Sequence, residues 1–356
     1  YQLFYEWMYE SVRGFQPIDF AIVLIILGTV VFVGFMAGIL VGILLAVLLF
    51  VLRYSMISAI QGQYSLASYR SSVERAQSSN DVLDEFGGQG LVYSLRGFLF
   101  FGTANAILDT IRDDAKVRSS DYKVILLDLK RVTGIDISAL NTFVQIRALC
   151  EASGVKLIYS GVGREAKRSL LMMDAVSTEH DEPLIFSDAD YAVEYMEDVV
   201  LESHAKESQG GSIKDHLMGL FRDEEKVDIL FSHMTRVEIE GSDILFEQND
   251  PEDGFYMLES GSMTALIGTS ENGFKRVKKF RPGSLLGELS AYTAERTRTA
   301  TVIADEDSVL YFLSSDSLAR LDTVNLKLAA SIHELVARTL AGRVAYMNRR
   351  LFLEMK

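Results

Sequence analysis

The residues best suited to chemistry lie in one short stretch, FRPGSLLGELSAYTAERTRTATVI, at residues 280–303. Gly283 and Gly287 allow tight backbone turns, and a short helix after Gly287 would present free backbone N–H groups to an anion. Arg298 adds a forked cationic donor, and Glu288 supplies a carboxylate that can accept a hydrogen bond from a sugar hydroxyl. The stretch therefore predicts a small pocket for a phosphate attached to a sugar.

This stretch, which we call the cassette, resembles the phosphate-binding cassette of cyclic nucleotide-binding domains. In that family a Gly-Glu pair starts a short helix, the Glu meets the ribose 2′-OH, and a later Arg binds the cyclic phosphate. The resemblance implies cAMP or cGMP as a regulatory ligand. It also implies a set of ligand-binding residues, namely Gly287, Glu288, Leu289, Ser290, Arg298 and Thr299. The alternative is a cassette that is kept as a turn of the fold and binds no nucleotide.

The residues around the cassette fit such a domain. The preceding segment, TRVEIEGSDILFEQNDPEDGFYMLESGSMTALIG, alternates short strands with turn residues, as an antiparallel roll does. Residues 315–350 carry apolar side chains at helical spacing. In the family such a helix closes over the base as a lid; plain packing on the roll or on a second subunit is the alternative. We expect a β-roll domain with flanking helices over residues 214–356.

The first part of the chain is strongly apolar. Residues 18–52 contain one early acid, Asp19, and no further charged residue before Arg53. One straight helix of that length would span roughly 52 Å, which exceeds a hydrocarbon core of about 30 Å, so two short membrane helices fit better. Glycines within residues 34–42 mark the expected break or close helix packing. Basic residues follow the run and place the next segment in the cytoplasm. A buried core helix is the alternative.

The middle of the chain has a different pattern. From residue 90 to residue 202, short apolar strands such as KVILLDL alternate with amphipathic helical stretches, which indicates an α/β sheet domain. Residues 53–89, which we call the connector, are polar and Ser-rich. Residues 203–213 are a polar Gly/Ser linker. The pattern therefore predicts a multidomain chain: an α-helical membrane hairpin, an α/β domain and a β-roll domain.

The middle segment resembles a STAS domain, the fold of bacterial anti-sigma factor antagonists and of the cytoplasmic tail of sulphate permease (SulP) transporters. The loop GIDISAL at residues 134–140 matches the signature turn of STAS domains. In stand-alone antagonists the Ser at the place of Ser138 is phosphorylated, at a helix start that favours a phosphate. The interpretation that we prefer is simpler: Asp136 or Ser138 caps the helix by accepting a backbone N–H.

The N-terminal part also resembles SulP transporters. The run IDFAIVLIILGTVVFVGFMAGILVGILLAVLLFVLRYS looks like their last two membrane helices, and LRGFLFFGTAN looks like the start of their STAS tail. The resemblance implies the C-terminal regulatory part of a secondary transporter, for an anion, in which the STAS and cyclic nucleotide-binding domains modulate transport. The chain begins at Tyr1, so we expect a piece of a longer protein, with residues 1–52 ending its membrane domain. The alternative is a non-transporting membrane-anchored scaffold or dimerisation module with an empty cassette.

Composition narrows the classes of function further. The net charge of −14 argues against nucleic acid as a partner. The single cysteine, Cys150, cannot form an internal disulfide and fits a reducing compartment. The five histidines lack metal-ligand spacing, and the sequence shows no nucleophile elbow, phosphate-binding P-loop or paired catalytic carboxylates. We therefore expect an integral membrane homodimer with cytoplasmic STAS and β-roll domains, no metal site and no enzymatic activity.

Overall fold

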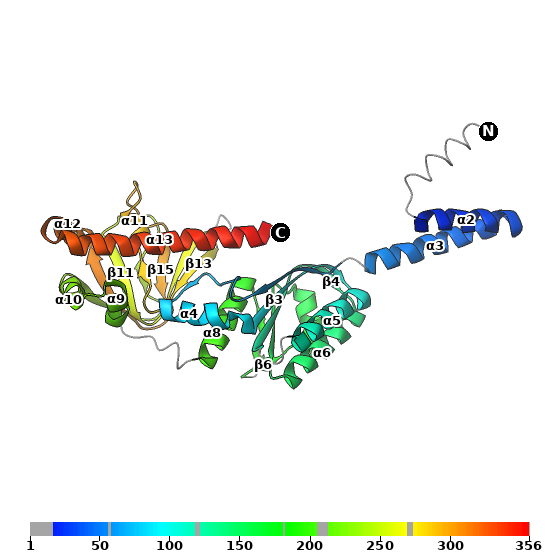
Figure 1. Ribbon diagram of the computed structural model, residues 1–356, viewed down its shortest axis with the longest axis horizontal. Coiled ribbons are helices and arrows are strands. Elements are labelled where there is room, and N and C mark those ends of the chain that lie inside the picture. Colours follow the sequence, from blue (N-terminus) through cyan, green and yellow to red (C-terminus); the bar gives the residue numbers. More distant parts are fainter. Residues whose placement is uncertain are drawn as a thin grey trace, which may run out of the picture.

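The computed structural model describes residues 17–55, 58–117, 122–180, 182–204, 213–268 and 273–355. Figure 1 shows three parts in sequence order: a helical hairpin, an α/β domain, and a β-roll domain with a long C-terminal helix. The hairpin lies at one end of the molecule and the roll at the other, with the α/β domain between them. The expected multidomain architecture is confirmed for the two folded domains.

The hairpin consists of helices α2 (Pro17–Phe32) and α3 (Phe35–Ser55). The chain reverses at Gly34, whose φ of +124° suits only glycine. A Cβ on Gly38 would lie 2.2 Å from Cγ2 of Val30 on the facing helix. The glycines therefore provide both the break and the close helix packing that the sequence indicates.

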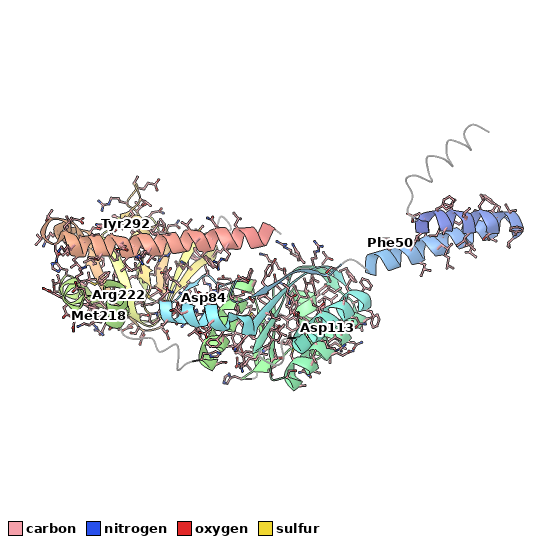
Figure 2. All side chains as sticks on the ribbon, viewed as in Figure 1. Phe50, Asp84, Asp113, Met218, Arg222 and Tyr292 are labelled. Atoms are coloured by element: carbon pink, nitrogen blue, oxygen red, sulfur yellow. The ribbon has the colours of Figure 1, made fainter. Side chains whose placement is uncertain are left out.

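The outer surface of the hairpin is apolar. Phe32 and Met36 are 88% and 78% exposed, and Phe50 belongs to the same end of the molecule (Figure 2). We expected two membrane crossings over residues 18–52, and the hairpin itself is present. However, none of the described helices combines the length and the apolar character that a membrane crossing needs; the turn at Gly34 ends α2 after 16 residues.

The α/β domain is built on one five-stranded sheet. Its strands, in spatial order, are β1 (Ile60–Ser65), β3 (Gly90–Leu99), β4 (Val124–Ile135), β5 (Lys156–Ser160) and β8 (Ile185–Phe186). All neighbours run parallel except β1, which is antiparallel to β3. One face packs against α5 (Phe101–Val117), α6 (Ile137–Ala152) and α7 (Arg164–Met172), and the other against α4 (Gln77–Phe86) and α8 (Ala189–Ser203). Coverage of both faces explains the continuous apolar sequence of β4.

The connector is more structured than its polar sequence indicates. It contributes β1, α4 and the 3-10 turn η1 (Gly87–Gln89) to the α/β domain. Strand β1 has the sequence IQGQYS and lies at the edge of the sheet, where it is half exposed. An edge strand of this kind lacks the apolar run that marks a buried strand, so the description of residues 53–89 as a plain connector was incomplete.

The β-roll domain consists of two facing sheets. The first contains β10 (Ile244–Phe246), β15 (Thr301–Ala304), β12 (Met263–Gly268), β13 (Phe274–Phe280) and β2 (Val73–Glu74); the second contains β14 (Leu285–Leu286), β11 (Gly254–Ser260), β16 (Ser308–Ser314) and β9 (Thr235–Ile239). The helices packed on the second sheet are α9 (Ile213–Phe221), α10 (Glu224–Ser232), α12 (Ser315–Val324) and α13 (Leu326–Met355). A small hairpin of β6 (Thr178–Glu179) and β7 (Glu182–Pro183) belongs to the α/β domain.

One strand of the roll comes from the connector. Strand β2 pairs in parallel with β13, with Val73 opposite Lys279 and Glu74 opposite Phe280. The segment that leads from the hairpin to the α/β domain therefore adds a strand to the edge of a roll sheet. Such edge addition fixes position through main-chain hydrogen bonds, and so it ties the connector to the roll.

Opposite charges join helix α8 of the α/β domain to strand β13 of the roll. Arg276 lies 2.8 Å from a carboxylate oxygen of Asp190 and also pairs with Glu194. Lys279 lies 3.0 Å from Glu194. These side chains are largely buried, so solvent screens their attraction only weakly.

A second ion pair anchors the connector to α8. Glu197 is 2% exposed and accepts hydrogen bonds from the backbone N–H of Ser71 at 2.8 Å and from its hydroxyl at 2.5 Å. Arg75 lies 3.3 Å from Glu197 and 2.9 Å from Asp198. Arg75 and Glu197 depend on each other because neither is well solvated.

The substitution Glu197→Gln tests this anchor. We expect it to lower the free energy of unfolding by about 2–3 kcal/mol, because it leaves the buried guanidinium of Arg75 with one partner fewer. Urea denaturation of the chain in detergent micelles measures the change. The control is Glu238→Gln, which breaks an exposed pair with Arg236 and should cost within about 0.5 kcal/mol. Equal losses of unfolding free energy in the two variants would show that the buried ion pair stabilises the chain no more than the exposed pair does.

Candidate functional site

Within the cassette, a tight turn joins strand β14 to the short helix α11 (Glu288–Ala291). Gly287 caps this helix with a left-handed φ of +78°. A Cβ at this position would lie 2.4 Å from Nη1 of Arg298. Glycine is therefore required both by the backbone conformation and by the close approach of the arginine.

Arg298 is held entirely by protein groups. Its side chain is 1% exposed and lies over the ring of Phe246, with the guanidinium carbon 4.3 Å from the ring centroid. It donates a hydrogen bond to the carbonyl of Gly287 at 3.0 Å and forms an ion pair with Asp253, which is 62% exposed. A phosphate could take the place of the Asp253 carboxylate, because both are anions that a guanidinium binds through paired N–H groups.

Glu288 is completely buried at the start of α11. Burial raises the pKa of its carboxyl, and the nearby carboxylate of Glu74 adds to this, while Arg343 opposes both. One oxygen accepts a hydrogen bond from Arg343, and the other, Oε2, has no hydrogen-bond partner among the described residues. This oxygen can still accept a hydrogen bond, for example from a sugar hydroxyl.

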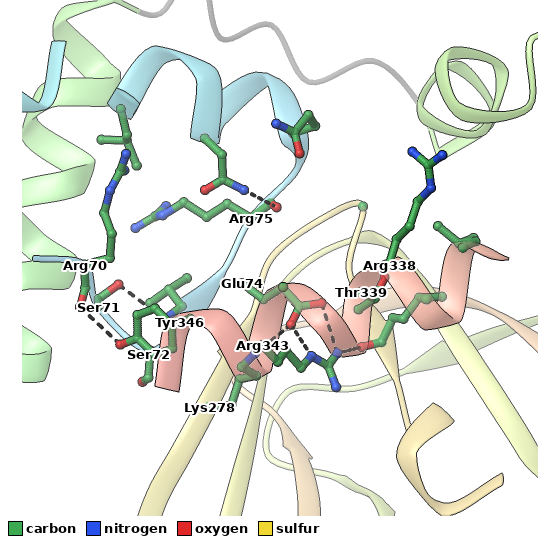
Figure 3. A pocket seen from close by; sticks show the side chains of 18 of the residues that line it. Arg70, Ser71, Ser72, Glu74, Arg75, Lys278, Arg338, Thr339, Arg343 and Tyr346 are labelled. Atoms are coloured by element: carbon green, nitrogen blue, oxygen red, sulfur yellow. Dashed lines mark hydrogen bonds and ion pairs between the residues drawn. The ribbon is translucent and has the colours of Figure 1, made fainter. Parts of the chain in front are cut away.

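Arg343 of helix α13 is the residue that sequence reasoning missed. It binds Glu288, and it also forms a two-pronged pair with Glu74 of β2, with Nε 2.7 Å from Oε2 and Nη2 3.0 Å from Oε1 (Figure 3). Nη2 also donates to the carbonyl of Leu285 at 2.9 Å. The pattern of the helix gives no signal for this role, because the partner Glu74 is far away in sequence.

The carboxylate of Glu74 forms ion pairs with two cations at the edge of the cassette. Burial disfavours its charge, but Lys278, at 2.8 Å, and Arg343 outweigh burial and hold the pKa of Glu74 below its ordinary value. The connector therefore carries a carboxylate that stays ionised against the roll. Its charge compensates the same guanidinium that binds Glu288.

The other predicted cassette residues differ in their surroundings. Ser290 is buried within α11, whereas Leu289 is 40% exposed and Thr299 is exposed. Tyr292, just after α11, lies beside α13 (Figure 2), and its hydroxyl is 2.6 Å from Nδ1 of His333. The structure thus brings Gly287, Glu288 and Arg298 together and leaves Leu289 and Thr299 at the surface.

The signature loop of the α/β domain contains the expected helix cap. Asp136 precedes α6, and its carboxylate accepts a hydrogen bond from the backbone N–H of Ala139 at 2.7 Å. Ser138 lies in the first turn of the same helix and is exposed. Asp136 therefore fills the capping role, which leaves the Ser138 hydroxyl at the surface. Across the described residues, no group of His, Cys, Asp and Glu has the arrangement of a metal site.

Comparison with known proteins identifies both folded domains. Residues 75–192 match the family model of the STAS domain, and residues 236–323 match that of the cyclic nucleotide-binding domain. The chain is 30% identical over 208 residues to the vacuolar basic amino acid transporter VSB1 of Saccharomyces cerevisiae, covering 56% of this chain and 20% of the transporter. It is 29% identical over 104 residues to the cAMP-dependent protein kinase regulatory subunit of Blastocladiella emersonii, covering 29% of this chain and 26% of that subunit. The chain thus spans a fifth to a quarter of the length of these relatives.

Solved structures give similar matches. A cyclic nucleotide-binding domain from Methylobacillus flagellatus is 19% identical, with a TM-score of 0.36, and the match covers 40% of this chain and 86% of that one. The two family models, by contrast, fall on the α/β domain and on the roll that contains Glu288 and Arg298. The chain therefore contains a STAS domain followed by a cyclic nucleotide-binding domain.

Proposed function

We propose that this chain is the regulatory C-terminal part of a SulP-type secondary transporter, in which the cyclic nucleotide-binding domain acts on the membrane part through the connector. The order of the parts supports this proposal: an apolar hairpin, then a STAS domain, then the roll. The similarity to a vacuolar basic amino acid transporter supports a role in transport, although SulP transporters in general suggest an anion as the cargo.

In this proposal the hairpin packs among further membrane helices of a longer protein. Its large exposed apolar side chains, such as Phe32 and Met36, need such partners or lipid to leave water. Arg53 lies in the last turn of α3 and Arg70 follows the hairpin in sequence, and by the positive-inside rule the STAS domain and the roll lie in the cytoplasm in this proposal.

The observation that carries the proposal is the bridge from Glu288 through Arg343 to Glu74. A ligand hydroxyl that donates to Oε2 of Glu288 shares that carboxylate with Arg343 and weakens its hold on Arg343. If Arg343 moves, Glu74 loses its two-pronged partner and β2 is held less firmly on the roll. Ligand binding and the position of the connector are therefore coupled, and the coupling acts equally in both directions.

One observation favours a scaffold as the second candidate function. Both ligand-binding groups already have partners in the protein, since Arg298 binds Asp253 and Glu288 binds Arg343. A cassette that stays closed in this way would hold the domains together without responding to a nucleotide. The two functions differ in whether Arg343 and Asp253 can be displaced.

Helix α13 supports a homodimer under either function. Apolar residues recur along it at the alternating spacing of three and four that marks a coiled-coil seam: Ala337, Val344, Met347 and Leu351 are exposed, and Leu340 between them is partly packed against the roll. Val344, Met347 and Leu351 are 57%, 66% and 59% exposed. We propose that this seam, rather than the cassette, pairs with the same helix of a second copy.

Calorimetric titration of the full chain in detergent micelles with cAMP and with cGMP tests ligand sensing. We expect Arg343→Gln to bind one of the two about tenfold more tightly than the unchanged chain, because the competitor for Glu288 is gone. Arg298→Ala should weaken binding by about tenfold or more, since the phosphate loses a charge-assisted hydrogen bond.

The control for this titration is Arg236→Ala, which removes an arginine from an exposed pair and should leave binding unchanged. If neither the unchanged chain nor Arg343→Gln gives any heat with either nucleotide, ligand sensing is refuted and the scaffold function stands.

The dimer is tested by Met347→Glu. We expect this variant to sediment as a monomer where the unchanged chain sediments as a dimer, because two like charges would face each other across the seam. Analytical ultracentrifugation in a density-matched detergent measures the mass. Val324→Glu is the matched control, since Val324 is 85% exposed and lies outside the seam. A monomeric unchanged chain would refute the proposed seam.

A further inference from the structure

A cavity of about 620 Å³ lies where the connector, helix α9 and helix α13 meet the roll (Figure 3). Gly283 and Leu285 of the cassette line it, but Glu288 and Arg298 do not, so the cavity is distinct from the predicted ligand-binding residues of the cassette. Its size is in the range of about 300–1,000 Å³ that small-molecule sites occupy, and domain junctions are a common place for such sites.

The polar lining of the cavity is rich in cations. The basic side chains are Arg70, Arg75, Lys278, Arg338 and Arg343, against the two carboxylates Glu74 and Glu197. Figure 3 shows that the arginines come from two sides, the connector and α13. A ligand in the cavity would therefore meet guanidinium groups from two segments that are far apart in sequence.

One of these cations has incomplete compensation. Arg70 contacts Asp84 at 2.6 Å through Nη2, but its buried Nη1 has no hydrogen-bond partner among the described residues. Burial lowers the pKa of Arg70 and of Lys278 despite their neighbouring carboxylates. Arg338 donates hydrogen bonds to Glu334 on its own helix through Nε and Nη2, and both side chains are exposed. An anion in the cavity would supply the acceptor that Nη1 of Arg70 lacks, and Arg338 would add a second positive charge.

The rest of the lining is apolar. This part of the wall consists of Leu83 of α4, Ile213 and Leu217 of α9, Met257 of β11 and Leu335 of α13. A bare inorganic anion would leave that wall uncovered. A ligand with both an anionic group and an apolar portion would use the whole cavity.

We propose that this cavity is a second ligand site, which binds a phosphorylated small molecule with an apolar ring, the class to which nucleotides belong. The phosphate binds Arg70 of the connector, the ring lies against the leucines of α4 and α9, and Arg338 of α13 faces the ligand from the opposite side of the cavity (Figure 3). A phosphate suits Arg70 because a guanidinium binds phosphate oxygens through charge-assisted hydrogen bonds. The ligand then joins the connector to α13.

The charge of the site is tested with the full chain in detergent micelles, titrated calorimetrically with AMP, ATP and inorganic phosphate. We expect AMP or ATP to bind, Arg70→Gln to weaken that binding at least about tenfold, and Arg338→Gln to weaken it less. Lys275→Gln is the control, because Lys275 is an exposed cation on β13 outside the cavity. Arg298→Ala should also leave this binding unchanged, since Arg298 does not line the cavity.

A second experiment tests whether the ligand occupies the cavity, without removing any charge. Gly342 of α13 lines the cavity, and a Cβ there would meet nothing within 4 Å. Gly342→Leu should therefore fold, since leucine favours a helix more than glycine does, and should narrow the cavity and weaken binding. Gly219→Leu is the matched control: Gly219 is also helical, exposed and without a neighbour within 4 Å, but it lies outside the cavity.

Three outcomes would overturn the proposal. The first is no binding of AMP or ATP by the unchanged chain. The second is binding that Arg298→Ala removes and Gly342→Leu leaves intact, which would place the nucleotide in the cassette. The third is inorganic phosphate binding as tightly as AMP and ATP, which would show that the apolar wall takes no part.

Discussion

The structure depends on the compensation of buried charge around Arg343. One guanidinium binds Glu288, which is fully buried in the roll, and Glu74, which belongs to the connector. Removing either carboxylate from such a cluster would leave the remaining charges buried with too few partners. The cassette therefore keeps its shape only while the connector is in place. This makes the cyclic nucleotide-binding domain sensitive to the segment that precedes the STAS domain.

The contact between the two folded domains combines a rigid element with adjustable ones. Strand β2 fixes the register of the connector on β13, with Val73 opposite Lys279. The pairs between α8 and β13, such as Arg276 with Asp190, are ionic rather than apolar. Interfaces between domains of this polar kind tend to allow relative motion, whereas large apolar interfaces do not. The observed contact thus suits a regulatory role better than a purely structural one.

Local sequence patterns predicted most of the fold, but they could not predict contacts between residues that are far apart in the sequence. The apolar strand β4, the cap at Asp136 and the turn at Gly287 follow from period, cap chemistry and glycine conformation, all of which are local. Strand β2 has only two residues and pairs with a strand about 200 positions later, so no local pattern reveals it. The role of Arg343 could not be predicted for the same reason. Its partners Glu74 and Glu288 become neighbours only after both domains have folded.

Helix α13 connects the cassette to the cavity. Arg343 reaches the cassette carboxylate and also lines the cavity, together with its neighbour Gly342 and with Arg338, one turn earlier. A ligand on Glu288 weakens the hold of Arg343 on that carboxylate, while a ligand in the cavity holds α13 against the connector. The two ligands would therefore favour opposite positions of one helix. By linkage, each would lower the affinity of the other by the same factor, so the junction would report the balance of two small molecules rather than the presence of one.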